Sequence, residues 1–313
     1  MSHADRLTGE FAYIDWIRKQ TRTTAATVIG IGDDAAALRP APGRDVLVTT
    51  DMIIEGIHFD LARMAPRLVG RKAMAVNLSD IAAMAGVPVA AVASVGLPRA
   101  ISRTAAEQLY VGLRELADQF NVALVGGDTN ASPHGLVVCV TLVGETTPLG
   151  AVRRSGARPG DWVMATGAFG GSILGRHLEF TPRVHEALML HERYDAHAMI
   201  DVSDGLAADL GHIAGESRCG AMIEAAAVPI SDAARSLARD KASLLEHALH
   251  DGEDFELLFT LDPGAARRLI ADQPLGVPVS RLGEIVAERG LWLVDSSGAR
   301  RPLEPRGYDH FRS

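Results

Sequence analysis

The chain is poor in lysine, and its charge balance excludes one broad class of partner. Only Lys19, Lys72 and Lys241 are lysines among the 31 basic residues, and 39 acidic residues bring the formal net charge to −8. An acidic chain without clustered basic residues does not fit a nucleic-acid-binding surface, so we expect no nucleic-acid partner. The excess of arginine over lysine is interpreted as coding bias rather than as function.

Cysteines and long apolar runs are also scarce. Cys139 and Cys219 are the two cysteines, and they have neither the number of a disulfide framework nor the paired spacing of a zinc site. The longest uncharged stretch, 81–97, is interrupted by Gly86 and Pro88 and is too short to span a bilayer. The first nineteen residues lack the apolar core of a signal peptide. We therefore expect a cytoplasmic protein with no membrane partner.

The remaining composition is that of an ordinary globular protein of about two domains. Apolar residues make up 47% of the 313 residues and charged residues 22%. A polar, basic, turn-rich segment at 153–161 marks a boundary, so we expect domains at 1–150 and 151–313. Strands and helices alternate in the first half without a strict rhythm, which predicts an α+β domain with a mixed or antiparallel sheet.

An acidic motif at 198–213 contains three aspartates within nine residues. A short apolar run there breaks into Asp201, Ser203 and Asp204, and Asp209 follows in a helical pattern. A strand that ends in acids before a helix can place oxygen ligands beside a helix N-terminus, which favours anions. This arrangement indicates a metal and a phosphate together. The alternative is that Ser203 or Asp204 merely caps the helix.

The acidic theme recurs in two earlier strand regions. Asp33 and Asp34 follow a short Gly-rich strand, and because successive strand side chains point to opposite faces, one of the two is a ligand candidate. The alternative is an ordinary turn rich in Gly and Asp. Residues 45–52 predict a buried strand ending in Thr49, Thr50 and Asp51, where hydroxyl and carboxylate oxygens again become available as ligands.

Two further acids lie in small-residue surroundings. Asp80 occupies an alanine-rich helix predicted at 68–85, where a buried carboxylate needs a cation or a solvent cavity. The run 122–129 predicts a strand and a glycine turn, with Asp128 at the strand end and Gly127 allowing close approach of a ligand. The glycine-rich segment 167–172 has neither Walker A nor dinucleotide-binding spacing, so a plain strand-to-helix turn is expected there.

Together these acids exceed what one ion requires, because Mg²⁺ usually takes one or two protein carboxylates and completes its shell with water and phosphates. They predict several Mg²⁺ ions that coordinate the phosphates of a nucleoside triphosphate during in-line phosphoryl transfer. The six candidates are Asp34, Asp51, Asp80, Asp128, Asp201 and Asp204.

Eight motifs, in this order, carry a family resemblance: IGDDAA, TTDMIIEGIHF, GRKAMAVNLSDIAAMAG, VGGDT, RRSGARPGD, IDVSDGLAADLGHI, GEDFELLF and GYDHF. The resemblance begins at about residue 9, and the series of motifs spans residues 31–311. It closely resembles the thiamine-monophosphate kinases, a family of the aminoimidazole ribonucleotide synthetase superfamily.

The resemblance implies an activity, a fold and a set of site residues. The activity is transfer of the ATP γ-phosphoryl group to thiamine monophosphate, and the fold is an N-terminal α+β half whose strands pair across a homodimer, followed by an α/β C-terminal half. The first half would bind ATP and Mg²⁺, and the second would complete the substrate site. The implied Mg²⁺ ligands are Asp34, Thr49, Thr50, Asp51, Asp80, Asp128, Asp201 and Asp204. The implied ATP contacts are Tyr110, Gly127, Asp128, Arg154 and Ser203, and the implied thiamine phosphate contacts are His58, Glu253 and Tyr308.

The chemistry of these residue types agrees with the implied roles. Arg154 can bind phosphate oxygens through two donors, and Tyr308 offers an aromatic face to a cationic thiazolium. The acceptor is a phosphate oxygen that is already anionic, so we expect no general base. Phe255 stands where many relatives are expected to carry Tyr. The alternatives are another ATP-dependent phosphoryl-transfer enzyme of the superfamily, or a nucleotide- and Mg²⁺-binding protein without turnover.

Overall fold

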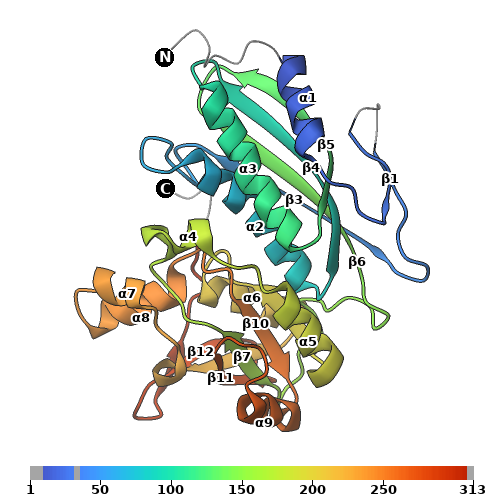
Figure 1. Cartoon of the computed structure of the whole chain (residues 1–313). Coiled ribbons are helices and arrows are strands. Elements are labelled where there is room, and N and C mark those ends of the chain that lie inside the picture. Colours follow the sequence, from blue (N-terminus) through green and yellow to red (C-terminus); the bar gives the residue numbers. More distant parts are fainter. Residues whose placement is uncertain (1–9, 32–35, 309–313) are drawn as a thin grey trace. The chain divides into compact units, whose positions relative to one another are not determined.

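The computed structural model describes residues 10–31 and 36–308, which form two compact units (Figure 1). The first unit holds the chain up to Ile81 and then Gly86–Gly150, and the second holds Ala82–Ala85 and the chain from Ala151 onward. Each unit is built on a sheet of its own. Among the helices of the described residues, none is both long and apolar enough to cross a membrane.

The first unit contains a four-stranded mixed sheet with the order β3-β6-β4-β5. The β4–β5 pair is parallel and the other two pairs are antiparallel, which confirms the α+β class predicted for this half. A separate pair of short strands, β1 and β2, is antiparallel. The elements of this unit are α1 (Glu10–Gln20), β1 (Thr27–Ile29), β2 (Ala37–Leu38), β3 (Val46–Ile54), α2 (Pro66–Ala83), β4 (Val87–Pro98), α3 (Arg103–Gln119), β5 (Ala123–Ser132) and β6 (Val137–Glu145).

Two strands of this sheet are longer than the sequence predicts. The sequence predicted one strand over 45–52, with Thr49, Thr50 and Asp51 at its end, and another with Asp128 at its end, but β3 continues to Ile54 and β5 to Ser132. The reason is backbone pairing: β3 pairs with β6 as far as Ile54, and β5 pairs with β4 as far as Ser132. Polar side chains do not end a strand whose backbone groups still have partners in the neighbouring strand.

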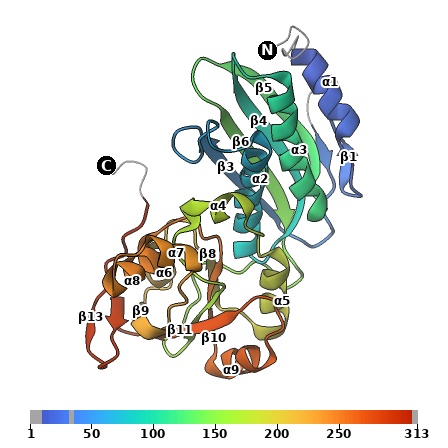
Figure 2. The same ribbon diagram turned by 60° about the vertical axis from the view of Figure 1, so that its left-hand side comes forward.

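The sheet has a covered face and an open face. Along β3, Leu47 and Ile53 are buried, whereas the alternate residues Val46, Val48 and Met52 are between 50% and 66% exposed. Helices α2 and α3 cover the buried face (Figures 1 and 2). Because strand side chains alternate, Thr49 and Asp51 share the covered face with Leu47, and Thr50 lies on the open one.

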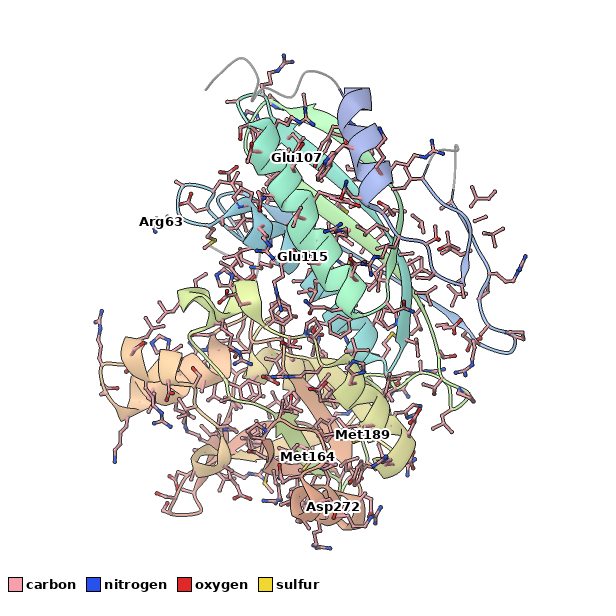
Figure 3. All side chains as sticks on the ribbon, in the orientation of Figure 1. Arg63, Glu107, Glu115, Met164, Met189 and Asp272 are labelled. Carbon is pink, nitrogen blue, oxygen red and sulfur yellow. The ribbon has the colours of Figure 1, made fainter. Side chains whose placement is uncertain are left out.

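Glycines bring α2 and α3 into direct backbone contact. A Cβ atom on Gly70 would lie 1.9 Å from the carbonyl oxygen of Leu109, and one on Gly112 would lie 1.8 Å from that of Arg67. Polar contacts flank this approach: Glu115 of α3 forms an ion pair with Arg67 of α2, and Glu107 pairs with Arg103 within α3; both glutamates are labelled in Figure 3. Helix α3 is therefore amphipathic, and its glycine sets how closely the two helices approach.

The second unit contains a seven-stranded sheet with the order β13-β12-β9-β11-β7-β10-β8, in which β9 and β12 are the parallel pair. Its helices and strands alternate along the chain as far as β11, as expected of this half, and the last three strands follow one another directly. The elements are β7 (Trp162–Thr166), η2 (Ser172–Leu174), α4 (Arg176–Glu179), α5 (Val184–Tyr194), β8 (Ala198–Asp201), α6 (Leu206–Glu216), β9 (Gly220–Glu224), η3 (Ala225–Ala227), α7 (Asp232–Leu237), α8 (Lys241–His250), β10 (Leu257–Leu261), α9 (Pro263–Asp272), β11 (Val279–Val286), β12 (Gly290–Val294) and β13 (Arg300–Pro302).

The core of the second unit lies between α6 and one face of this sheet. Leu206, Leu210 and Ile213 recur on one side of α6 and pack with Ile200 of β8 and Leu258 of β10, and all five are buried. This spacing is that of an apolar helix face. The packing fixes α6 directly after β8, so the acidic turn between them is held on both sides.

Candidate active site

In the first unit, three predicted metal ligands lie on the covered face of the sheet. The hydroxyl of Thr49 donates a hydrogen bond to Oδ2 of Asp80 in α2, and Asp51 projects from the same face of β3 as Thr49. Thr50 projects from the opposite face, where its hydroxyl donates to the carbonyl of Val140 at 3.2 Å. Of Thr50, only a backbone oxygen could share an ion with the side chains of Thr49 and Asp51.

Asp128 lies at the other edge of the same sheet. Asp51 pairs with Val140 of β6, Val140 with Ala93 of β4, and Ala93 with Gly127 of β5. Three inter-strand steps separate β3 from β5, or about 14 Å at the usual spacing. Asp128 follows Gly127 and therefore projects from the open face, opposite to Asp51. Within one chain, the Asp51 and Asp128 side chains do not bind the same ion.

A cavity of about 120 Å³ joins three of the predicted ATP contacts: Tyr110, Gly127 and Asp128 all line it. Tyr13 and Ile17 of α1 form another part of the wall, and no sequence pattern predicted them there. The remaining lining is largely apolar and comes from the strands and α3: Ile31, Ala93, Val95, Leu109, Leu113, Leu124, Gly126 and Thr129.

Hydrogen bonds and packing fix the walls of this cavity. The hydroxyl groups of Tyr110 and Thr21 are 2.6 Å apart, and Trp16 packs edge-on against the Tyr110 ring. Burial raises the pKa of Tyr110, so its hydroxyl is neutral near pH 7. A Cβ on Gly127 would lie 2.1 Å from the carbonyl oxygen of Ala93. Glycine at this position is therefore required by strand pairing itself, in addition to any ligand.

The predicted substrate residue His58 is tied to its own loop. Its Nδ1 accepts the backbone N–H of Ile54 at 3.1 Å, and Lys72 Nζ donates to the carbonyl of His58 at 3.0 Å. Lys72 is fully buried, so its ammonium group holds this loop from the inside of the first unit rather than lying in solvent. Asp33 and Asp34 lie outside the described residues.

In the second unit, the acidic motif forms the turn between β8 and α6. Asp201 is the last residue of β8. The N-cap residue of α6 is Gly205, and neither the Ser203 nor the Asp204 side chain caps the helix. The carboxylate of Asp209 instead turns back and accepts the N–H groups of Asp204 at 3.1 Å and Gly205 at 3.2 Å. The capping alternative for Ser203 and Asp204 is thus not what the structure shows.

Negative charge converges at this turn. Burial raises the pKa of the Asp209 carboxyl to about 8, and the charges of Asp201 and Asp204 add to the shift. Ligand atoms of Asp204, Asp209 and His212 lie within 4.8 Å of one another. A divalent cation fits such a set because it relieves the repulsion and suits oxygen and imidazole ligands. His212 was not predicted, although its spacing from Asp209 places both on one side of α6.

Backbone hydrogen bonds bring three more predicted residues to the same turn. Ser203 accepts the N–H of Glu253 at 2.7 Å, and Asp204 accepts the N–H of Tyr308 at 3.0 Å. Segments far apart in the sequence, 201–205, 252–256 and 307–308, therefore meet in one place. Arg154 is exposed and lies on another segment, where its carbonyl accepts the hydroxyl of Ser217 at 3.3 Å.

The glycine-rich segment 167–172 is a plain turn, as predicted. Its amide groups are already used: Gly170 donates to Asp254 and Gly171 to Asp251, both at 2.8 Å. These are the donors that a phosphate-binding loop would keep for its ligand. The segment therefore braces the 251–256 region instead.

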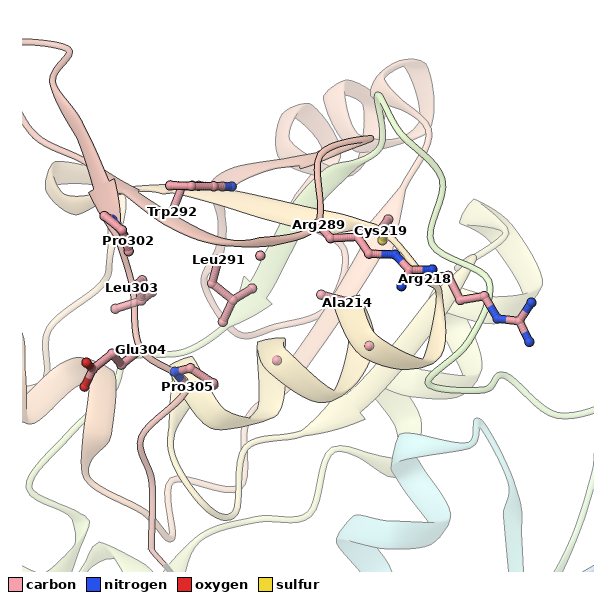
Figure 4. A pocket seen from close by; sticks show the side chains of 13 residues that line it. Ala214, Arg218, Cys219, Arg289, Leu291, Trp292, Pro302, Leu303, Glu304 and Pro305 are labelled. Atoms are coloured by element: carbon pink, nitrogen blue, oxygen red, sulfur yellow. The ribbon is translucent and has the colours of Figure 1, made fainter.

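A separate groove of about 510 Å³ lies between α6 and the strands β12 and β13 (Figure 4). Trp292, Leu291 and Pro305 contribute to its wall, and Arg289 lies at one end. None of the predicted site residues lines it. We therefore assign it no part in the candidate active site.

Comparisons with known proteins show which family the chain belongs to. Residues 32–146 match the family model for the N-terminal domain of AIR synthase related proteins, and residues 155–295 match that for the C-terminal domain. A thiamine-monophosphate kinase of Rhodopirellula baltica is 38% identical, over 96% of this chain and 97% of that protein.

Solved structures give the same result. The thiamine-monophosphate kinase of Stenotrophomonas maltophilia K279a has a TM-score of 0.80 at 36% identity, covering 91% of this chain and 96% of that one. A structure described as "AaThiL complexed with AMPPCP and TMP" has a TM-score of 0.76 at 30% identity, covering 99% and 100%. The chain therefore belongs to the AIR synthase related proteins and, among them, to the thiamine-monophosphate kinase family.

Proposed function

We propose that this chain transfers the γ-phosphoryl group of ATP to the phosphate of thiamine monophosphate, giving thiamine diphosphate and ADP. One observation carries the proposal: the chain matches, over 99% of its length, a structure described as holding AMPPCP and TMP. AMPPCP is an ATP analogue whose terminal phosphoryl group cannot be transferred. Such a complex holds a non-reactive analogue of ATP together with TMP, which corresponds to the substrate pair of the proposed reaction.

The cavity beside Tyr110 and Gly127 is proposed to receive the nucleotide. Its apolar residues, among them Ile17 and Leu124, suit a flat base, and Thr129 contributes a polar group. Ligand pockets commonly combine an apolar lining with a few polar groups that fix orientation. Ser203 and Arg154 are proposed as further ATP contacts through their hydroxyl and guanidinium groups.

Several Mg²⁺ ions are proposed as cofactors. Their ligands would be the predicted set of Asp34, Thr49, Thr50, Asp51, Asp80, Asp128, Asp201 and Asp204. Bound Mg²⁺ supplies neutralisation of the phosphate charges during in-line transfer. Support comes from the Asp209 carboxyl, whose pKa is raised first by burial and then by the negative charges of Asp201 and Asp204 beside it.

Thiamine monophosphate is proposed to meet His58, Glu253 and Tyr308. Tyr308 is 53% exposed although its backbone is anchored to Asp204, so its ring is available to stack on a cationic heterocycle. The acceptor phosphate carries negative charge near neutral pH, so these residues bind and orient it. No side chain is required to remove a proton.

The enzyme is further proposed to act as a homodimer through the open face of its N-terminal sheet. Val46, Val48 and Met52 expose an apolar row there, on the edge strand β3, and such patches mark protein interfaces. A second copy would also supply an Asp128 from outside the chain that holds Asp51. Size-exclusion chromatography with light scattering tests this, and a monomer at micromolar concentration contradicts it. Cytoplasmic location remains a prediction from the sequence.

The activity is tested by measuring ADP release with ATP, Mg²⁺ and thiamine monophosphate, with the thiamine product identified by chromatography. The proposal expects thiamine diphosphate only when the monophosphate is present and none after addition of a chelator. ADP formation that does not depend on the monophosphate would favour another acceptor of the superfamily. Nucleotide binding with no turnover for any acceptor would favour a binding protein.

A further inference from the structure

The segment 252–256 is held in a conformation that its residues would not adopt alone. Glu253 and Phe255 have φ angles of 65° and 50°, in the left-handed region that is unfavourable for residues with a Cβ atom. Such conformations persist only where surrounding contacts determine them, and they concentrate at functional sites. The contacts that side chains of this segment make with the rest of the unit therefore indicate which of its residues are held in a fixed position.

Two of the three carboxylates in the segment serve as buried anchors. Glu256 is 1% exposed and receives hydrogen bonds from Thr166, Arg176 and Arg183. Asp254 is fully buried and accepts the Gly170 N–H at 2.8 Å. Phe255 stacks on Phe180 with ring centroids 4.2 Å apart. These contacts all reach the segment from one side, from residues 166–183.

Glu253 differs from both anchors because its side chain remains 25% exposed. Its carboxylate Oε2 lies 3.1 Å from Nδ1 of His177, whose own side chain is completely buried. A buried ring has few orientations available, so this hydrogen bond fixes the position of one carboxylate oxygen of Glu253. His177 neighbours Arg176 in α4, and these adjacent residues hold Glu253 and Glu256 respectively.

We propose that His177 is a positioning residue that orients Glu253 for the thiamine phosphate acceptor. This inference rests on the proposed function, because it assigns a role to a residue that supports Glu253. The Nδ1–H of His177 donates to one carboxylate oxygen, which restricts rotation of the Glu253 side chain before substrate arrives. Pre-positioning of this kind reduces the ordering that binding must otherwise supply.

The test compares His177→Leu, which removes the donor, with His177→Asn, whose amide nitrogen stands close to where Nδ1 stood. We expect His177→Leu to raise the KM for thiamine monophosphate about tenfold, with little change in the KM for ATP. His177→Asn should restore most of the loss. His247→Leu is the matched control, because His247 Nδ1 makes a similar contact to Asp251 Oδ2 at 3.1 Å without touching Glu253.

A double-mutant cycle separates positioning from a general structural effect. In a Glu253→Ala background, His177→Leu should add little further change in KM, because the partner through which it acts is absent. Additive effects, or an unchanged KM in His177→Leu, would overturn the proposal. So would an unchanged KM in Glu253→Ala, since Glu253 would then have no role to support.

A failure of the proposed function is distinguished from a failure of this inference by the activity of the wild-type protein. If the wild type forms no thiamine diphosphate, the activity is wrong whatever His177 does. The role of His177 is then tested by calorimetry, as the affinity for thiamine monophosphate of the His177→Leu, His177→Asn and His247→Leu variants. Thermal unfolding of each variant identifies any that does not fold, and His177→Asn provides the second measurement if His177→Leu fails.

Discussion

The hydroxyl of Thr49 in β3 donates a hydrogen bond to the carboxylate of Asp80 in α2. The contact places a helix carboxylate beside the covered face of the sheet, the same face from which Asp51 projects. A strand and a helix 31 residues apart thereby contribute oxygen atoms to one region. Oxygen atoms grouped in this way are the kind of ligands that the proposed Mg²⁺ site would use.

The first prediction removes the charge of Asp80 while keeping its hydrogen bond. Asparagine retains an oxygen that accepts from Thr49, so Asp80→Asn should fold normally. We expect kcat to fall about a hundredfold, equivalent to about 3 kcal/mol of transition-state stabilisation. The measurement is ADP release over a range of Mg²⁺ concentrations, with Asp232→Asn as the control because Asp232 is fully exposed. Full activity of Asp80→Asn would remove Asp80 from the metal ligands.

The second prediction concerns the glycine contact between α2 and α3. Alanine favours helices over glycine by about 1 kcal/mol, but a Cβ at Gly112 would lie 1.8 Å from the Arg67 carbonyl oxygen. We expect Gly112→Ala to destabilise the protein by about 2 kcal/mol or more, because the helices must separate. Gly215 in α6 has nothing within 4 Å of its would-be Cβ.

Gly215→Ala is therefore the matched control, and it should stabilise the protein by about 0.5–1 kcal/mol. Thermal unfolding of the two variants should shift the midpoint in opposite directions. A rise in the midpoint for Gly112→Ala would show that α2 and α3 do not make this close contact in solution.

The sequence predicted many of the elements and the acidic motifs, because both are local properties. Apolar periodicity located α3, and the acids beside Gly205 located the turn after β8. Strand ends were predicted less well. The third strand was expected to stop at its polar residues, whereas pairing with β6 carries it to Ile54. That pairing joins residues more than 80 positions apart, which no local pattern contains.

The geometry of the candidate site depended even more on distant contacts. Asp51 and Asp128 look equivalent in the sequence, and the sheet order is what places them at opposite edges and on opposite faces. His177 gives no motif at all, because its partner Glu253 lies in a distant loop. Residue types indicated the chemistry, but strand order and loop packing decided which residues can act together.

The third prediction concerns the buried pair of Arg183 and Glu256. Arg183 Nε and Nη2 reach the two carboxylate oxygens at 2.8 and 2.7 Å. Burial by itself would lower the pKa of Arg183, but the hydrogen bonds and charge of Glu256 raise it overall. We expect Arg183→Lys to cost about 2 kcal/mol, because lysine cannot form the paired contact, and Arg183→Met to cost about 3 kcal/mol.

The cost of Arg183→Met arises mainly from the charge left on Glu256. Adding Glu256→Gln to Arg183→Met should therefore recover part of the lost stability, as measured by thermal unfolding at matched pH. Because the pair is buried, the losses should change little between low and high salt. Strictly additive losses, or losses that disappear in high salt, would contradict this view of the pair.

The fourth prediction is a pH dependence of stability from Asp254. Burial raises the pKa of this carboxyl to about 7, against the lowering influence of its hydrogen bonds with Ser172 and Gly170 and of the charge of Arg176. The unfolded chain has the ordinary, lower pKa, so between pH 4 and 7 the folded protein binds more protons than the unfolded one. Stability from this group is therefore full below pH 4 and is lost as the pH rises through 7.

Asp254→Asn removes that dependence, because asparagine stays neutral and its oxygen can still accept the Gly170 N–H. Between pH 5 and pH 8 the wild type should lose about 2–3 kcal/mol relative to this variant. Thermal or denaturant unfolding of both proteins at the two pH values measures the difference. Parallel pH profiles would mean that Asp254 is ionised in the folded protein throughout this range. The contacts from Ser172 and Arg176 would then outweigh the cost of burying its charge.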